Sequence, residues 1–194
     1  PEHIVAAAEQ AMRSGAHGYT PTAGTPALRQ AVAEMSSALA QTTHQPLDVL
    51  VSSGAKQSLH NLMQALVDPG DEVLVPAPYW VSYPVMAQLA EGVFRPIPTT
   101  LEQGFRLTPD ALKEALTDRS RVLILNSPSN PTGSAYTKQE LEALAEVVLS
   151  HPQLVVVSDE IYRHLVYGEH QHTSFASLSP EAAARCCLVD GVSK

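Results

Sequence analysis

Short apolar runs alternate with longer segments of helical periodicity along most of this chain of 194 residues. Runs of four to eight residues rich in Val, Ile and Leu have the length of buried strands. Strands that alternate with helices are typical of a mostly parallel sheet covered by helices on both faces. We therefore predict an α/β fold. The expected strands are Asp48–Ser52, Glu72–Val75, Gly92–Ile97, Arg121–Asn126, Leu154–Ser158 and Cys186–Asp190.

Two of the expected helices begin with recognisable caps. Thr108 precedes a proline at the first helical position, and Thr137 and Glu140 have the spacing of a capping box. Gly15–Gly24 is expected to be a loop and Gln41–Pro46 a polar linker. The expected helices are His3–Ser14, Pro26–Leu39, Gln57–Val67, Tyr83–Ala90, Ala111–Leu116 and a helix that ends at Leu149.

Composition narrows the possible functions. Twelve Lys and Arg against twenty Asp and Glu give a net charge of −8, without a basic cluster. An acidic chain of this kind is a poor candidate for gripping a nucleic-acid backbone. The sequence contains no run of about 18 apolar residues, the length that would suggest a membrane span. Cys186 and Cys187 are adjacent, so neither a disulfide nor a CxxC metal pair is expected, and we interpret both as small core residues in a reducing compartment.

Ligands of parallel sheets bind beyond the carboxyl ends of the strands, so the residues that follow each strand are the candidates for function. Gly54, Ala55 and Lys56 lead directly into a helix and would let backbone N–H groups approach an anion, although a plain tight turn has the same pattern. The only tryptophan, Trp80, lies in a Pro-rich loop, where it would either stack on a flat ligand or fill the rim of the loop. The patterns GxGxxG and GxxxxGK are absent, so neither a dinucleotide fold nor a Walker loop is indicated.

Later strand ends carry an amide, two acids and a lysine. Asn130 lies in a loop made rigid by two prolines and a glycine, where a turn-forming asparagine is also common. Asp159 ends a buried strand and needs a partner, and its neighbour Glu160 is expected to point to the opposite side. His170 and His172 lie in a polar loop and are expected to be solvated, so no metal site is predicted. Lys194, taken by itself, is a terminal charge.

Taken together, these segments resemble the class I aminotransferases of the type I pyridoxal-phosphate fold, across essentially the whole chain. Within that family the chain looks most like the aspartate aminotransferases of plants and bacteria that also use prephenate, and the stretch 151–178 is especially similar to the plant members. The segments that carry the resemblance are Tyr19–Gly24, Gly54–Gln57, Tyr79–Pro84, Asn126–Gly133, Ser158–Tyr162 and Gly191–Lys194.

The resemblance implies roles for individual residues around pyridoxal 5'-phosphate. Lys194 matches the lysine that binds the cofactor covalently and moves a proton during the reaction, two tasks for which a neutral amine is suited. Asp159 matches the acid that pairs with the pyridine nitrogen. Tyr162 and Asn130 match two donors to the ring oxygen, and Asn130 is also expected to contact substrate. Trp80 matches a residue that stacks on the ring and contacts substrate.

Further roles concern the phosphate, the substrate and a second subunit. Gly54, Ala55 and Lys56 match the turn under the phosphate. Tyr19 matches a tyrosine that reaches the phosphate of the neighbouring subunit, so the resemblance implies a homodimer. Thr20 and Lys56 accompany the use of dicarboxylates such as prephenate, with Lys56 as the positive charge for a second carboxylate.

The chain also departs from the family pattern. Many members have a serine where this chain has Gly191, so Ser193 or the backbone is expected to replace that phosphate donor. The chain opens at Pro1 and ends at Lys194, and we expect a fragment whose small domain is largely missing and which is inactive by itself. The expected organisation is N-terminal helices with a substrate and dimer loop over 1–40, and an incomplete cofactor-binding domain over 41–194.

The function implied by the resemblance is transamination between aspartate or glutamate and a 2-oxo acid, prephenate included. A pyridoxal-phosphate lyase or synthase on the same fold is one alternative, because a fold does not determine the reaction. A non-catalytic, cofactor-sensing regulatory domain is another. A cytoplasmic or plastid-stroma location is expected, and any targeting segment would lie outside the sequence.

Overall fold

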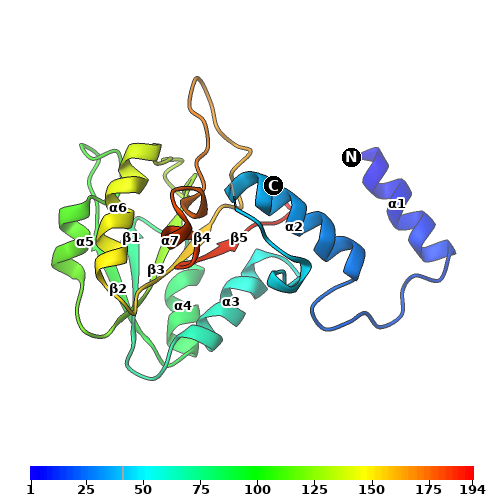
Figure 1. Ribbon diagram of the computed structural model, residues 1–194, viewed down its shortest axis with the longest axis horizontal. Helices are drawn as coiled ribbons and strands as arrows, with labels where there is room; N and C mark the ends of the chain where they lie inside the picture. Colours follow the sequence, from blue (N-terminus) through cyan, green and yellow to red (C-terminus); the bar gives the residue numbers. More distant parts are fainter. Residues whose placement is uncertain (41) are drawn as a thin grey trace.

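Five parallel strands form one sheet, in the order β2-β1-β3-β4-β5, in the computed structural model, which describes residues 1–40 and 42–194. The sheet and the helices around it confirm the predicted α/β fold (Figure 1). Each strand agrees with its predicted run to within two residues at either end. The strands are β1 (Glu72–Ala77), β2 (Val93–Pro98), β3 (Ser120–Asn126), β4 (Val155–Asp159) and β5 (Cys186–Val189).

Helices cover both faces of the sheet. One face packs against α3 (Ala55–Leu66) and α4 (Ser82–Leu89), and the other against α5 (Pro109–Ala115), α6 (Lys138–Ser150) and α7 (Pro180–Ala183). Neighbouring strand residues alternate between the two cores: Val73 joins the α3/α4 side and Leu74 the α5/α6 side. Burial on both faces explains why the central strands β3 and β4 are continuous apolar runs, whereas the edge strand β2 is mostly exposed.

The predicted helix caps are present. The backbone N–H of Ala111 donates to Thr108 Oγ1 at 3.2 Å, at the start of α5. Thr137 and Glu140 form the reciprocal capping box at the start of α6. Three short elements were not predicted, the 3₁₀ helices η1 (Pro46–Asp48) and η2 (Phe175–Ser177) and the helix α7, because each is shorter than the windows in which periodicity is visible.

The predicted strand Asp48–Ser52 is wrong. Its first residue ends the 3₁₀ helix η1 (Pro46–Asp48), and the remainder is irregular. Val51 donates one backbone hydrogen bond to the carbonyl of Ala23, at 3.0 Å, and no ladder continues from it. Gly24 lies so close that a Cβ there would be 2.7 Å from Val51 Cβ. A β-branched run without an adjacent strand has no partner for its backbone groups, so it does not join the sheet.

The N-terminal region holds α1 (Glu2–Arg13) and α2 (Pro26–Ala40), with the predicted loop between them. No residue of α1 is buried, and Figure 1 shows α1 apart from the rest of the molecule. The first residue of the predicted linker Gln41–Pro46, which is also the predicted domain boundary, lies outside the described residues. Among the helices of residues 1–40 and 42–194, none has both the length and the apolarity needed to cross a membrane.

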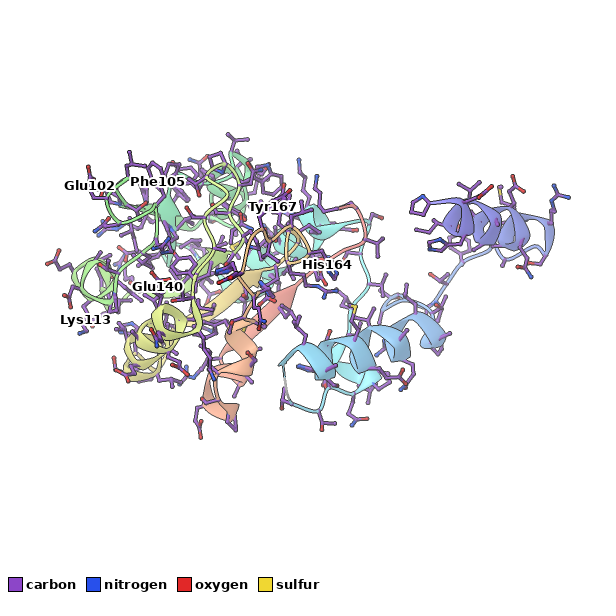
Figure 2. The ribbon with its side chains drawn as sticks, turned by 90° about the horizontal axis from the view of Figure 1, so that it is seen from above. Glu102, Phe105, Lys113, Glu140, His164 and Tyr167 are labelled. Atoms are coloured by element: carbon purple, nitrogen blue, oxygen red, sulfur yellow. The ribbon has the colours of Figure 1, made fainter. Side chains whose placement is uncertain are left out.

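The strand order creates a crevice at the carboxyl edge of the sheet. The chain passes from β1 outward to β2 and then returns to β3 on the other side of β1, so the loops after β1 and β3 leave in different directions. The loop after β4 follows the same edge. Figure 2 shows His164 and Tyr167 on that loop, nearer to α2 than to Lys113 of α5.

Candidate active site

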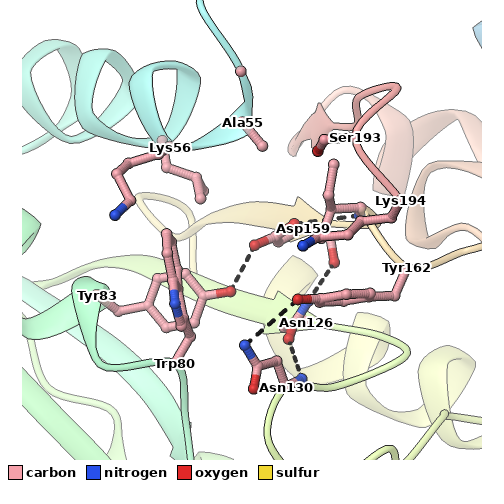
Figure 3. Close-up of a pocket in the computed structure, with 13 residues that line it drawn as sticks. Ala55, Lys56, Trp80, Tyr83, Asn126, Asn130, Asp159, Tyr162, Ser193 and Lys194 are labelled. Atoms are coloured by element: carbon pink, nitrogen blue, oxygen red, sulfur yellow. Dashed lines mark hydrogen bonds between the residues drawn. The ribbon is translucent and has the colours of Figure 1, made fainter.

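A pocket of about 350 Å³ opens at this edge of the sheet. Its volume falls in the range of about 300–1,000 Å³ typical of small-molecule sites. The lining comes from the start of α3 and from the residues that follow β1, β3, β4 and β5 (Figure 3). The residues that line it are Gly54, Ala55, Lys56, Leu59, Trp80, Tyr83, Asn126, Asn130, Asp159, Ile161, Tyr162, Ser193 and Lys194.

Asp159 is a buried acid at the floor of the pocket. It is the last residue of β4, and only 3% of its surface is exposed. Tyr83 Oη donates to Asp159 Oδ2 at 2.6 Å, and the N–H of Ile161 lies 3.3 Å from Oδ1. Burial raises the pKa of Asp159, against the opposing effect of these two donors. A carboxylate in this state is stabilised by a cationic partner.

Two asparagines connect the loop after β3 to the end of β4. Asn126 Nδ2 donates to the carbonyl of Asp159 at 2.9 Å, and Asn126 Oδ1 accepts from the N–H of Asn130 at 2.7 Å. These bonds turn the Asn130 side chain toward Tyr162, whose Oη is 3.5 Å from Asn130 Nδ2. An amide and a phenol therefore face the same part of the pocket (Figure 3).

Lys194 enters the pocket from the segment after β5. Its Nζ lies 5.6 Å from the centroid of the Tyr162 ring, and Ser193 lines the pocket beside it. The lysine itself is exposed, so its amine is accessible to a ligand.

Trp80 and Lys56 form the opposite wall. Lys56 Nζ is 5.0 Å from the centroid of the Trp80 indole, a cation–π distance. The indole packs edge-on against Tyr83, with centroids 5.5 Å apart and an interplanar angle of 87°. This contact with the buried Tyr83 holds the indole in place, so the plane of the Trp80 ring lies at the side of the pocket.

The N-terminus of α3 provides the third wall. Gly54 has φ +88°, a left-handed conformation that favours glycine, and a Cβ there would meet open space. The first N–H groups of an α-helix have no partner within the helix and attract anions. The helix begins at Ala55 and Lys56, so these groups point toward the pocket that both residues line.

The structure brings most of the predicted site residues together, at the positions given above. Two predicted residues lie elsewhere: Tyr19 and Thr20 are exposed in the loop between α1 and α2, and neither lines the pocket. Their assignment to a neighbouring subunit and to substrate stays a prediction. The sequence did not single out Tyr83, which reads as a core residue of an apolar helix, or the role of Asn126 in orienting Asn130.

Asp159 and Glu160 point to different sites, as predicted. The prediction that His170 and His172 are solvated is wrong, because His170 Nε2 is buried and the His172 ring contacts Glu160. Glu160, 1% exposed, accepts from Ser158 Oγ at 2.8 Å and from Ser174 Oγ at 2.7 Å. His172 Nε2 lies 2.7 Å from the other oxygen of Glu160, with its side chain 9% exposed. A buried carboxylate is costly without partners, and this one draws the loop histidine inward. Within the described part of the chain, no group of three or more His, Cys, Asp or Glu is placed to hold a metal ion.

Solved structures show the same fold. The chain matches the Thermus thermophilus aspartate aminotransferase with maleate at a TM-score of 0.95 and 44% identity, over all of this chain and 50% of that one. The fold is thus the type I fold of the aminotransferases. A family model described as aminotransferase class I and II matches residues 1–194, and this chain belongs to that family.

Curated relatives are similar over the whole chain. It is 47% identical over 194 residues to an aspartate aminotransferase of Geobacillus stearothermophilus, covering 49% of it. It is 50% identical over 194 residues to a bifunctional aspartate aminotransferase and glutamate/aspartate-prephenate aminotransferase of Petunia hybrida, covering 40% of it. The chain therefore spans half or less of the length of these two relatives.

Enzymes of this family depend on pyridoxal 5'-phosphate, and the pocket fits that cofactor. The buried Asp159 suits a protonated pyridine nitrogen, and the start of α3 suits a phosphate. The flat Trp80 side chain suits an aromatic ring, and the exposed amine of Lys194 suits an aldehyde.

Proposed function

We propose that this chain forms the cofactor-binding part of an aminotransferase that moves an amino group between aspartate or glutamate and a 2-oxo acid, with prephenate among the acceptors. The observation that carries the proposal is the convergence of Asp159, Tyr162 and Lys194 on one pocket beside the start of α3. The relatives whose names specify aspartate and prephenate support the choice of substrates.

Different pocket residues would contact different parts of the cofactor. Asp159 would hold the pyridine nitrogen, and its tie to Tyr83 would keep the carboxylate oriented. Tyr162 and Asn130 would donate to the ring oxygen, because both side chains face the same part of the pocket. Bound pyridoxal phosphate would supply an aldehyde that captures amines and a ring that withdraws electrons.

The phosphate would lie at the start of α3. The N–H groups of Ala55 and Lys56 are the first of that helix, and Gly54 leaves space beside them. Ser193 lines the same pocket and offers a hydroxyl donor in place of the serine that is missing at Gly191.

Lys194 and Lys56 would act on the substrate from opposite walls. Lys194 Nζ would hold the cofactor between turnovers and would take a proton from the substrate Cα once the substrate has displaced it. Lys56 would pair with the second carboxylate of a dicarboxylic substrate, since its ammonium stands over Trp80 at the pocket rim. Trp80 would shield the reacting atoms from water on that side.

The test follows ¹⁵N from labelled aspartate in the full-length product of the gene that contains this sequence. We expect transfer of the label to 2-oxoglutarate and to prephenate, and no transfer in Lys194→Ala. Protein that binds pyridoxal phosphate but moves no label to any 2-oxo acid would overturn the proposal. Release of the amino group as ammonia, or cleavage of the substrate skeleton, would indicate the lyase alternative.

A further inference from the structure

An ion pair joins the two segments that carry Tyr162 and Lys194. Arg163 Nε lies 2.5 Å from Asp190 Oδ2, and the two side chains are only 13% and 15% exposed. Arg163 belongs to the turn after β4, one residue beyond Tyr162. Asp190 is the first residue after β5. The pair therefore bridges two neighbouring strand ends at the edge where the pocket opens.

The same carboxylate fixes the start of the segment that leads to the lysine. Asp190 Oδ1 accepts from the N–H of Gly191 at 2.8 Å, so the two oxygens of Asp190 hold Arg163 and Gly191 at once. On the other side, the N–H of Arg163 donates to the carbonyl of Glu160 at 2.9 Å. Each partner is thus tied to its own backbone segment as well as to the other.

The two segments come close at Gly191 and again where Lys194 Nζ stands over the Tyr162 ring. A Cβ at Gly191 would lie 2.9 Å from Ile161 Cδ1, so the side chain of the Tyr162 turn packs directly against the backbone at this position. Val192 is 98% exposed, and Ser193 and Lys194 are also exposed. The partly buried Asp190 carboxylate is therefore the last polar anchor before these exposed residues.

Arg163 also reaches the N-terminal region. Its Nη2 lies 3.1 Å from Met35 Sδ, on α2. The guanidinium thus stands between α2, the turn after β4 and the segment after β5, and it is held on three sides. A planar, fixed cation of this kind orients its partner more firmly than a flexible ammonium would.

We propose that Arg163 and Asp190 are positioning residues, which hold the Lys194 segment against the Tyr162 turn so that the lysine amine faces the cofactor site. The inference rests on the proposed function, in which Lys194 is the attachment residue. Neither side chain lines the pocket, so the pair acts through the segments that it joins. Removing one partner leaves the other charge buried without compensation, which displaces the segment rather than simply weakening a contact.

Two ligands separate positioning of the lysine from construction of the pocket. Pyridoxal phosphate has an aldehyde, and borohydride fixes it to a correctly placed lysine as a secondary amine. Pyridoxamine phosphate has no aldehyde and binds the same pocket without a covalent link. The experiment compares the rate of fixation at Lys194, followed by peptide mass spectrometry, with the Kd of pyridoxamine phosphate, both in the full-length gene product.

For Arg163→Met we expect fixation at Lys194 to slow by about tenfold or more, because small misplacements of a reacting group have large effects on rate. The Kd of pyridoxamine phosphate is expected to change much less. Arg163→Lys should recover part of the rate. The double variant Arg163→Met/Asp190→Asn should be no slower than Arg163→Met, because the two residues act as one pair.

Arg106→Met is the matched control. Arg106 pairs with Glu140 at 2.7 Å, in a partly buried Arg–carboxylate contact that does not involve the pocket. We expect this variant to fix pyridoxal phosphate at the wild-type rate. If Arg163→Met does not fold, Asp190→Asn and Arg163→Lys carry the same comparison, because both keep a polar group in place.

Two results would overturn the positioning role: an unchanged fixation rate in the folded Arg163 and Asp190 variants, or a loss of pyridoxamine-phosphate affinity in parallel with the loss of fixation. The second would mean that the pair supports the whole pocket. Failure of the proposed function gives a different result. In that case the wild-type protein either binds neither ligand in the pocket or carries the label on a residue other than Lys194.

Discussion

Tyr83 Oη donates to Asp159 Oδ2 at 2.6 Å, although 76 positions separate the two residues in the sequence. Both residues are almost fully buried, and the carboxylate faces the pocket. Burial raises the pKa of both groups. The phenol therefore keeps its proton and donates it to the hydrogen bond, and a cationic partner would stabilise the ionised acid. The bond connects α4 to β4 beneath the proposed cofactor site.

Tyr83→Phe removes this donor without changing the shape of the core. A hydrogen bond to a charged group contributes about 1.5–3 kcal/mol, so we expect the affinity for pyridoxamine phosphate to fall by at least about tenfold. Isothermal titration calorimetry measures the change. Tyr167→Phe is the control, because Tyr167 is 82% exposed and does not line the pocket. Equal affinities for the wild type and Tyr83→Phe would show that Tyr83 is only a packing residue.

The buried acid also predicts a pH dependence of stability for the protein without cofactor. The pKa of Asp159 is raised above 3.8 in the folded state, so the folded protein binds more protons than the unfolded chain in the interval above that value. The free energy of unfolding contributed by Asp159 therefore decreases as pH rises through this interval. Urea unfolding of Asp159→Asn across a pH series should show a stability relative to wild type that grows with pH. A constant difference between the two proteins at all pH values would contradict the raised pKa.

His172→Ala tests the buried network around Glu160. The substitution removes the partner 2.7 Å from Glu160 Oε2, and leaving part of a buried carboxylate unsatisfied costs about 1–3 kcal/mol. We expect the free energy of unfolding to fall by about that amount in chemical denaturation. His164→Ala serves as the control, since His164 is exposed on the same loop. Equal losses in the two variants would mean that His172 contributes nothing specific.

Much of the fold was predictable because it depends on local pattern. Strands such as β3 and β4 are buried on both faces and therefore stand out as continuous apolar runs. The caps at Thr108 and Thr137 depend on residues only three positions apart. The run Asp48–Ser52 has the same local character but no adjacent strand, and a partner is a property of the tertiary structure that the run itself does not contain.

The candidate site was predictable where motifs follow strand ends, and was not predictable where distant side chains meet. Asn130, Asp159 and Lys194 follow strands, and the family resemblance gave these positions their roles. Tyr83 lies in an apolar helix, where tyrosine is ordinarily a core residue, and its partner is far away in sequence. His172 lies in a polar loop, and only the burial of Glu160 explains why its ring turns inward.

Lys56→Ala tests the proposed dicarboxylate preference. Loss of a charge-assisted contact of about 1.5–3 kcal/mol predicts that kcat/KM for aspartate falls by about 10–100-fold in the full-length gene product. The value for alanine, which has no second carboxylate, is expected to change much less. Lys113→Ala is the control, because Lys113 is an exposed residue of α5 outside the pocket. A parallel loss for both amino acids would place Lys56 on the cofactor alone.

Whether this pocket holds pyridoxal phosphate on Lys194 is tested most directly by identifying the lysine that carries the cofactor. The pocket contains two lysines, Lys56 and Lys194, on opposite walls. The measurement is borohydride reduction of the protein with bound pyridoxal phosphate, followed by peptide mass spectrometry. We expect a pyridoxyl group on Lys194 alone and no label in Lys194→Ala. Labelling of Lys56 with Lys194 unmodified would contradict it.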